Sequence, residues 1–224
     1  MQQHDSIPLD DFIEYPPQQM HQRSMEFYQD IKRRHSIRQF SDKPVSRKII
    51  ENCIKAAGTA PNGANHQPWH FTAISSPDIK RQVREQAEAH EQRFYDGAAN
   101  DEWLNALKPL GTDAQKPYLE TAPWLIAVFS QKKGGVEAGE KNTNYYIHES
   151  VGIATGFLIT ALHHAGLATL THTPKPMSFL SKICQRPDDE RPYMLIIVGH
   201  PDEKATIPKH ALKKKRLDEI ADFL

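Results

Sequence analysis

Cysteine is scarce in this sequence. Cys53 and Cys184 are the two cysteines among its 224 residues, and they lie far apart in no CxxC arrangement. This argues against a disulfide framework and against a zinc site built on cysteines, so we expect two buried thiols. His163 and His164 are adjacent and would point in different directions on a helix, and no HExxH spacing occurs. We therefore expect no metal.

Long apolar runs and an excess of one charge are also missing. The longest strongly apolar run covers residues 124–129, far below the ~20 residues of a membrane helix. The start MQQHDSIPLDDF has no basic-then-apolar signal pattern. The 28 basic and 28 acidic side chains cancel, so nothing global attracts nucleic acid or an anionic membrane. We expect a cytoplasmic protein with neither partner.

Helix and strand patterns interleave along the chain. The segment after Pro44 predicts a helix that Ser46 caps and Gly58 ends, and further helices are expected over residues 76–94 and 146–165. Strands are expected over residues 69–74, 124–129, 167–173 and 193–198. This predicts one α/β domain over residues 1–224, with a mixed central β-sheet flanked by helices.

The N-terminal segment differs from the rest. Residues 1–20 contain Pro8, Pro16 and Pro17 among scattered apolar residues. We expect an extended arm there that needs another surface, such as a partner subunit, to pack against.

Two segments suggest a binding site for a phosphorylated ligand. Residues 33–38 combine arginines, a histidine and a serine, and the arginine fork matches phosphate oxygens. From this segment alone, a solvated basic helix end is the favoured interpretation. Residues 60–65 form a turn-rich loop in which Gly63 permits close approach of a ligand, although Pro-Asn-Gly is common in turns that bind nothing.

Together these segments, RRHSIRQFSDKPV and AAGTAPNGANHQPWHF, resemble the N-terminal FMN-binding signature of the nitroreductase superfamily. The resemblance extends through nearly the whole chain. It implies an α+β fold, an FMN cofactor and an obligate homodimer with exchanged terminal extensions and two flavins at the interface. The FMN contacts that it implies are Arg34, His35, Ser36, Arg38, Pro61, Asn62, Gly63, Thr171, His172, Thr173 and Lys214. Asn62 stands where serine is commoner, and Lys214 where the family has an arginine.

Residues in the middle of the chain point to one family within this superfamily. Glu91 and Tyr95 are four residues apart on a predicted helix, and Lys116 follows in an irregular stretch. Carboxylate, hydroxyl and ammonium groups can hold an amino-acid zwitterion; without the flavin signature, an exposed helix pair and an unrelated lysine would be preferred. The set resembles the substrate lid of iodotyrosine deiodinases, here residues 91–117. That resemblance implies that the Ala64 amide contacts the substrate phenolate and that Thr173 donates to flavin N5.

The expected activity is FMN-dependent reductive dehalogenation of halotyrosines, 3-iodo-L-tyrosine to L-tyrosine plus iodide, by stepwise one-electron transfer. The natural reductant is unknown from sequence. The alternatives are an NAD(P)H-dependent nitroreductase or quinone reductase, a flavin destructase, which lacks such a lid, and a non-catalytic flavin-storing or interaction protein.

Overall fold

The first unit of the chain carries a single long helix. The computed structural model describes residues 6–98, 101–137 and 139–224, and the chain separates into two compact units, residues 1–34 and 35–224. In the first, residues 6–16 are irregular and α1 (Pro17–Ile31) follows. The predicted arm is therefore wrong from Pro17 onward, because proline at the first position of a helix removes no hydrogen bond. Residues 1–5 of that arm lie outside the described residues.

The second unit is built on a four-stranded sheet in the order β1-β2-β6-β5. Its strands are β1 (Trp69–Ile74), β2 (Trp124–Gln131), β6 (Glu190–Gly199) and β5 (Ala168–His172). All three neighbouring pairs are antiparallel, and an isolated parallel bridge joins Ser36 to Thr169 beside β5. We expected a mixed sheet. In the described residues, the strands themselves pair antiparallel, and the bridge between Ser36 and Thr169 is the parallel contribution. β1 and β5 are opposite edges of the sheet.

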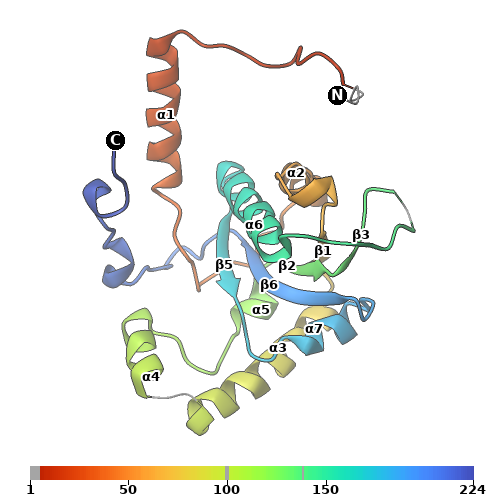
Figure 1. The fold of residues 1–224 in the computed structure, drawn as a ribbon. Coiled ribbons are helices and arrows are strands. Elements are labelled where there is room, and N and C mark those ends of the chain that lie inside the picture. Colours follow the sequence, from red (N-terminus) through yellow and green to blue (C-terminus); the bar gives the residue numbers. More distant parts are fainter. Residues whose placement is uncertain (1–5, 99–100, 138) are drawn as a thin grey trace. The chain divides into compact units, whose positions relative to one another are not determined.

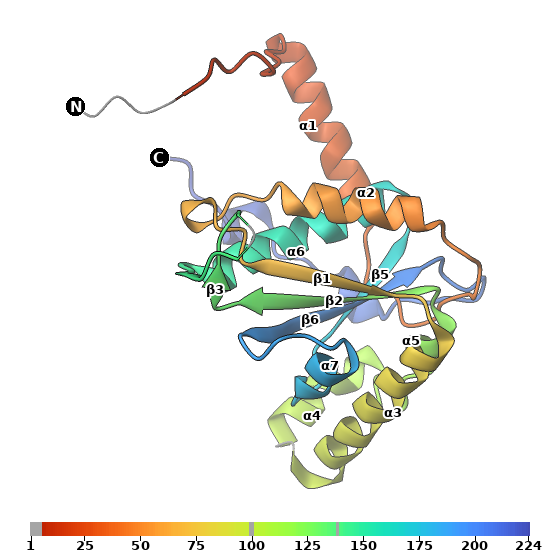
Figure 2. The ribbon, with the colours of Figure 1, turned by 90° about the vertical axis from the view of Figure 1, so that its right-hand side faces the viewer.

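Helices cover both faces of this sheet, as predicted (Figures 1 and 2). On one face lie α2 (Arg47–Gly58) and α6 (Ile147–His164), and on the other α3 (Pro77–Arg93), α5 (Tyr118–Thr121) and α7 (Ser178–Ile183). The shorter elements are η1 (Gly63–Asn65), η2 (Phe94–Ala98), α4 (Asp101–Leu107), η3 (Lys108–Leu110), β3 (Lys133–Gly134), β4 (Asn142–Thr143), η4 (Lys209–Leu212) and η5 (Leu217–Glu219). Within the described parts of the chain, no helix is long and apolar enough to cross a bilayer. The cellular location stays a prediction from sequence.

Successive side chains of β2 point to opposite faces of the sheet, and both faces are covered, which explains why its sequence is continuously apolar. Leu125, Ala127 and Phe129 belong to the core beneath α3, α5 and α7. Ile126 and Val128, which point to the opposite face, belong to the core beneath α2 and α6. All five are completely buried, and each large side chain contributes about 1.5–3 kcal/mol to folding. A strand covered on both faces needs apolar residues at every position, which is why the run could be predicted.

Candidate functional site

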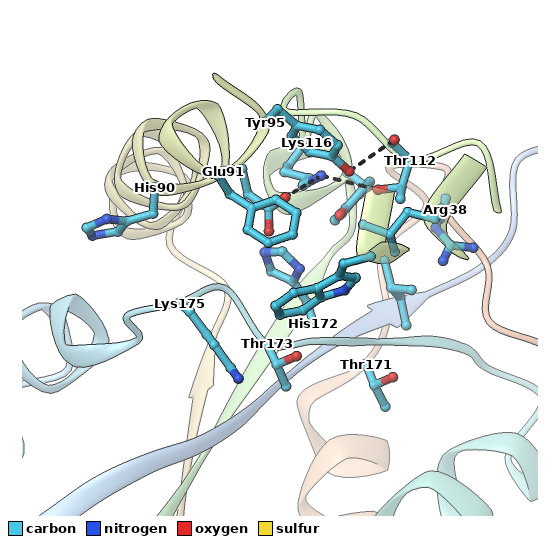
Figure 3. A pocket seen from close by; sticks show the side chains of 15 residues that line it. Arg38, His90, Glu91, Tyr95, Thr112, Lys116, Thr171, His172, Thr173 and Lys175 are labelled. Carbon is cyan, nitrogen blue, oxygen red and sulfur yellow. Dashed lines mark hydrogen bonds and ion pairs between the residues drawn. The ribbon is translucent and has the colours of Figure 1, made fainter. Parts of the chain in front are cut away.

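A pocket of about 210 Å³ opens where β5 ends, between that strand end and the segment that follows α3 (Figure 3). Its walls are formed by side chains from the segment before α2, from α3, η2, α4 and α5, from the loop before α5, and from the end of β5. They are Arg38, His90, Glu91, Phe94, Tyr95, Trp103, Leu107, Thr112, Lys116, Tyr118, Leu170, Thr171, His172, Thr173 and Lys175. The pocket therefore brings together three of the four predicted substrate residues, Glu91, Tyr95 and Lys116, and the flavin residues predicted at the end of β5. Ala64, the fourth, is not among its lining residues.

Lys116 is a buried cation in the wall of this pocket. Its side chain is 2% exposed, and its ammonium lies 3.3 Å from a carboxylate oxygen of Glu91. The ammonium also donates to the hydroxyl of Thr112 at 3.3 Å and to the backbone carbonyl of Asp113. These acceptors replace the water that a buried ammonium loses. Glu91 and Lys116, which we expected to hold opposite ends of a zwitterion, thus pair with each other in the structure.

Tyr95 completes this polar network. Its hydroxyl donates to the backbone carbonyl of Thr112 at 3.1 Å, and its ring centre lies 5.8 Å from the Lys116 ammonium. Burial raises the pKa of Tyr95 above its usual value, so the phenol stays protonated and able to donate at neutral pH. Figure 3 shows Glu91, Tyr95, Thr112 and Lys116 as one network above the strand end.

His172, the last residue of β5, lines the pocket next to this network. Its ring is buried, and Nε2 has no hydrogen-bond partner among the described residues. Burial, helped by the positive charges of Lys116 and Arg38, lowers the pKa of His172 to about 3. The imidazole is therefore neutral at physiological pH and adds no charge to the pocket. We expected a structural histidine from the residues alone and a flavin contact from the resemblance; the structure shows that it lines the pocket.

The hydroxyls of Thr171 and Thr173 lie on the other side of the same strand end. Both residues are exposed and His172 is buried, as the alternation of a strand requires. Arg38 lines the pocket as well, and its guanidinium forms no ion pair with any residue that the structure describes. The two hydroxyls at the strand end and the Arg38 guanidinium thus bring hydrogen-bond donors to one region.

The other predicted flavin residues of the N-terminal signature lie along β5 or outside this unit. Ser36 bridges Thr169, and the amide of Ile37 donates to the Thr169 carbonyl at 3.1 Å. This run places Arg38 at the pocket, and His35 is the first residue of the second unit. Arg34 is the last residue of the first unit.

Lys214 is not brought to the pocket. Its ammonium donates to the Ala211 carbonyl at 2.8 Å on an exposed segment. Whether it serves a flavin stays a prediction.

The predicted loop residues Pro61, Asn62, Gly63 and Ala64 lie next to β1, at the opposite edge of the sheet. The Asn62 side chain accepts the Gln67 amide at 2.7 Å, and the Gly63 amide lies 3.4 Å from the Ser150 hydroxyl. We expected Gly63 to supply unusual backbone geometry, but the left-handed residues of the loop are Ala64 and Asn65, with φ 51° and 56°. Glycine is required at 63 because a Cβ there would lie 2.8 Å from the Tyr145 carbonyl oxygen.

Sequence reasoning missed several lining residues. Tyr118 and Lys175 are among them, and the ammonium of Lys175 lies 5.6 Å from the centre of the Trp103 ring. Lys175 follows Thr173 and Pro174 directly. Its position just after the end of a strand could have indicated that it lines the site. No group of three or more potential metal ligands gathers in the described residues.

Comparison with known proteins shows to which family the chain belongs. The Nitroreductase family model matches residues 31–200. Iodotyrosine deiodinase from Haliscomenobacter hydrossis is 47% identical over 202 residues, which cover 90% of this chain and 91% of that protein. Iodotyrosine deiodinase 1 from Homo sapiens is 42% identical over 207 residues, covering 92% of this chain and 71% of that protein.

A solved structure shares the fold. Oxidized iodotyrosine deiodinase bound to FMN and 3-iodo-L-tyrosine matches with a TM-score of 0.72 and 30% identity, covering 85% of this chain and 96% of that one. The predicted α+β fold of this superfamily is thereby confirmed. The chain belongs to the nitroreductase family and, within it, to the iodotyrosine deiodinases.

Proposed function

We propose that this protein is an FMN-dependent oxidoreductase that removes halide from halotyrosines, with 3-iodo-L-tyrosine giving L-tyrosine and iodide. The observation that carries the proposal is the buried Lys116 ammonium 3.3 Å from Glu91, in a pocket that also includes the hydroxyl-bearing end of β5. The relatives named iodotyrosine deiodinase and the structure with bound FMN and 3-iodo-L-tyrosine support it.

The donors at the strand end fit a flavin. Flavin rings carry carbonyl oxygens and ring nitrogens that accept hydrogen bonds, and Thr171, Thr173 and Arg38 offer donors in one region. Thr173 is assigned to ring atom N5, and Thr171 and His172 to the neighbouring edge. Arg34, His35 and Ser36 are assigned to the phosphate and ribityl chain, and Lys214 to the phosphate. Reduced FMN, when bound, supplies two electrons singly, which together with one proton replace the carbon–iodine bond by carbon–hydrogen.

Substrate recognition uses the network around Lys116. An α-carboxylate accepts from the Lys116 ammonium and the Tyr95 hydroxyl, and an α-ammonium donates to Glu91. The zwitterion thus inserts between groups that already pair with each other. The segment from Glu91 to residue 117 acts as a lid that excludes water and holds the phenol ring over the flavin; residues 99 and 100 of this lid lie outside the described residues.

The proposal includes a homodimer. Residues 61–64 lie beside β1 and Thr173 follows β5, at opposite edges of one sheet, so a flavin that contacts both sets needs a second copy of the chain. The exposed apolar residues Ile153 and Phe157 of α6, each 42% exposed, provide a surface for such a partner. The backbone amide of Ala64 from that copy then reaches the substrate phenolate.

Iodide release tests this proposal. With dithionite as the reductant, the FMN-loaded protein should convert 3-iodo-L-tyrosine to tyrosine in repeated turnovers. Rapid reduction of nitroaromatics without iodide release would favour a nitroreductase instead.

A further inference from the structure

Helix α3 holds Lys116 at two points. Glu88 and Glu91 are three residues apart and share one face of the helix. The carboxylate of Glu91 pairs with the side-chain ammonium of Lys116 at 3.3 Å. One turn earlier, the carboxylate of Glu88 accepts the backbone N–H of the same lysine at 2.5 Å. The backbone and the side chain of Lys116 are therefore both fixed to α3.

Glu88 is itself held in place. Nε of Arg84 donates to the Glu88 carboxylate at 2.9 Å, and the same guanidinium reaches the Glu120 carboxylate at 3.4 Å. Glu120 belongs to α5, which begins two residues after Lys116. Arg84 thus links the acceptor of the Lys116 amide to the helix that follows.

Lys80 anchors the far end of the same segment. Its ammonium donates to the backbone carbonyls of Glu120 and Ala122 at 2.7 and 2.8 Å, and the residue is 7% exposed. A charged donor at the last carbonyls of α5 fixes this short helix against α3. The chain after Lys116 is therefore held to α3 by Lys80, and the Lys116 backbone N–H is held to the same helix by Glu88.

We propose that Glu88 is a positioning residue that makes the pocket selective for amino acids. Lysine carries its charge on a flexible four-carbon stem, so the location of the ammonium depends on how firmly its backbone is held. With the Lys116 amide bound to Glu88, the ammonium stays opposite Glu91, where it can meet an α-carboxylate. A phenol that lacks the amino-acid group gains nothing from this contact. The choice of ligand rests on the function proposed above.

A plain surface ion pair is the competing explanation. Glu88 and Arg84 are four residues apart on α3, and such pairs contribute little to stability. The two explanations differ because the positioning role needs an acceptor for the Lys116 amide, whereas the ion pair needs a negative charge. Glu88→Gln keeps an acceptor and removes the charge, and Glu88→Ala removes both. Glu85→Ala changes an exposed glutamate of the same helix and serves as the matched control.

Hydrogen exchange tests the anchor without any ligand. In the FMN-loaded protein, the Lys116 amide should exchange about 10- to 100-fold faster in Glu88→Ala than in Glu85→Ala, the factor that follows from losing a hydrogen bond to a charged group. Glu88→Gln should exchange at a rate near that of the wild type. Equal exchange in Glu88→Ala and Glu85→Ala would overturn the proposal.

Binding tests the selectivity. Flavin fluorescence titrations would compare 3-iodo-L-tyrosine with 2-iodo-4-methylphenol, which has the same ring without the zwitterion. Glu88→Ala should raise the Kd of the amino acid at least ~10-fold and leave that of the phenol unchanged, with Glu88→Gln close to the wild type. An equal loss for both ligands, or an unchanged Kd for the amino acid, contradicts selectivity. If wild type binds no halotyrosine, the proposed function fails, and hydrogen exchange still decides whether Glu88 anchors Lys116.

Discussion

The Lys116 ammonium lies 3.3 Å from the Glu91 carboxylate, with the lysine side chain 2% and the glutamate side chain 18% exposed. A buried ion pair costs desolvation and is weak support for stability by itself. Its position in a pocket wall gives it another use, because an amino-acid zwitterion carries both opposite charges and can join the pair without leaving a charge unpaired. We interpret the pair as a recognition device.

Glu91→Gln should remove amino-acid recognition. Truncating one member of a desolvated charge pair costs about 2–5 kcal/mol, so the Kd for 3-iodo-L-tyrosine should rise roughly 30-fold or more. Titration of the FMN-loaded protein measures this, with Glu85→Gln as the control on the same helix. An unchanged Kd would show that the zwitterion lies elsewhere.

Lys116→Met should abolish halotyrosine binding and also lower stability. Methionine fills the space of the lysine stem but offers no ammonium to an α-carboxylate. Glu91 and the Asp113 carbonyl would lose a charged donor, so the free energy of unfolding should fall by about 1–3 kcal/mol. Urea unfolding and ligand titration check the two parts. Lys108→Met, at an exposed lid lysine, should alter neither, and unchanged binding in Lys116→Met would contradict this account.

Lys80→Met should destabilise the fold. The two carbonyls of Glu120 and Ala122 would lose a charged donor, at a cost of about 1–3 kcal/mol. Thermal unfolding measures the change. The exposed Lys55 of α2 gives the control, Lys55→Met, for which Tm should not move; equal Tm values for both variants would show that the Lys80 contacts contribute nothing.

His172 should make stability depend on pH. Its folded pKa is about 3 and its ordinary value is 6.5, so between these values the unfolded chain binds a proton that the folded chain does not. Stability from this residue is therefore complete above pH 6.5 and falls toward pH 3, by up to about 1.4 kcal/mol per pH unit.

His172→Gln should lack this contribution. Urea unfolding of the FMN-loaded proteins from pH 4 to pH 8 compares the two slopes. Parallel curves for the variant and the wild type would mean that the buried imidazole titrates normally.

Local sequence patterns predicted most elements of the second unit. The strand over residues 69–74 has the predicted bounds, and the helix that ends at Gly58 is confirmed. These elements could be predicted because burial of one helix face leaves a periodic apolar pattern, and burial of both sheet faces leaves a continuous apolar run. The order of the strands and their antiparallel direction could not be predicted, since both depend on which distant strands pair. The side-chain capping bond expected from Ser46 is absent, although Ser46 stands at the helix start.

The site was predictable only in part. Glu91 and Tyr95 share a helix face, a relation that spacing alone gives. The burial of Lys116 was not visible, because a lysine in a loop between glycine and proline is ordinarily solvated. Its contacts come from Glu88 and Glu91, 28 and 25 residues away in sequence. Equally, the position of Gly63 at the sheet edge opposite Thr173 follows from strand order, which a single sequence does not reveal.

Anaerobic titration of the reduced, FMN-loaded protein with 3-iodo-L-tyrosine tests the central claim most directly. Flavin absorbance reports oxidation while chromatography reports tyrosine. The account predicts one tyrosine for each flavin oxidised, a yield that collapses at the same ligand concentration in Glu91→Gln. A flavin that stays reduced when 3-iodo-L-tyrosine is added, yet is oxidised rapidly by a nitroaromatic compound, would contradict it.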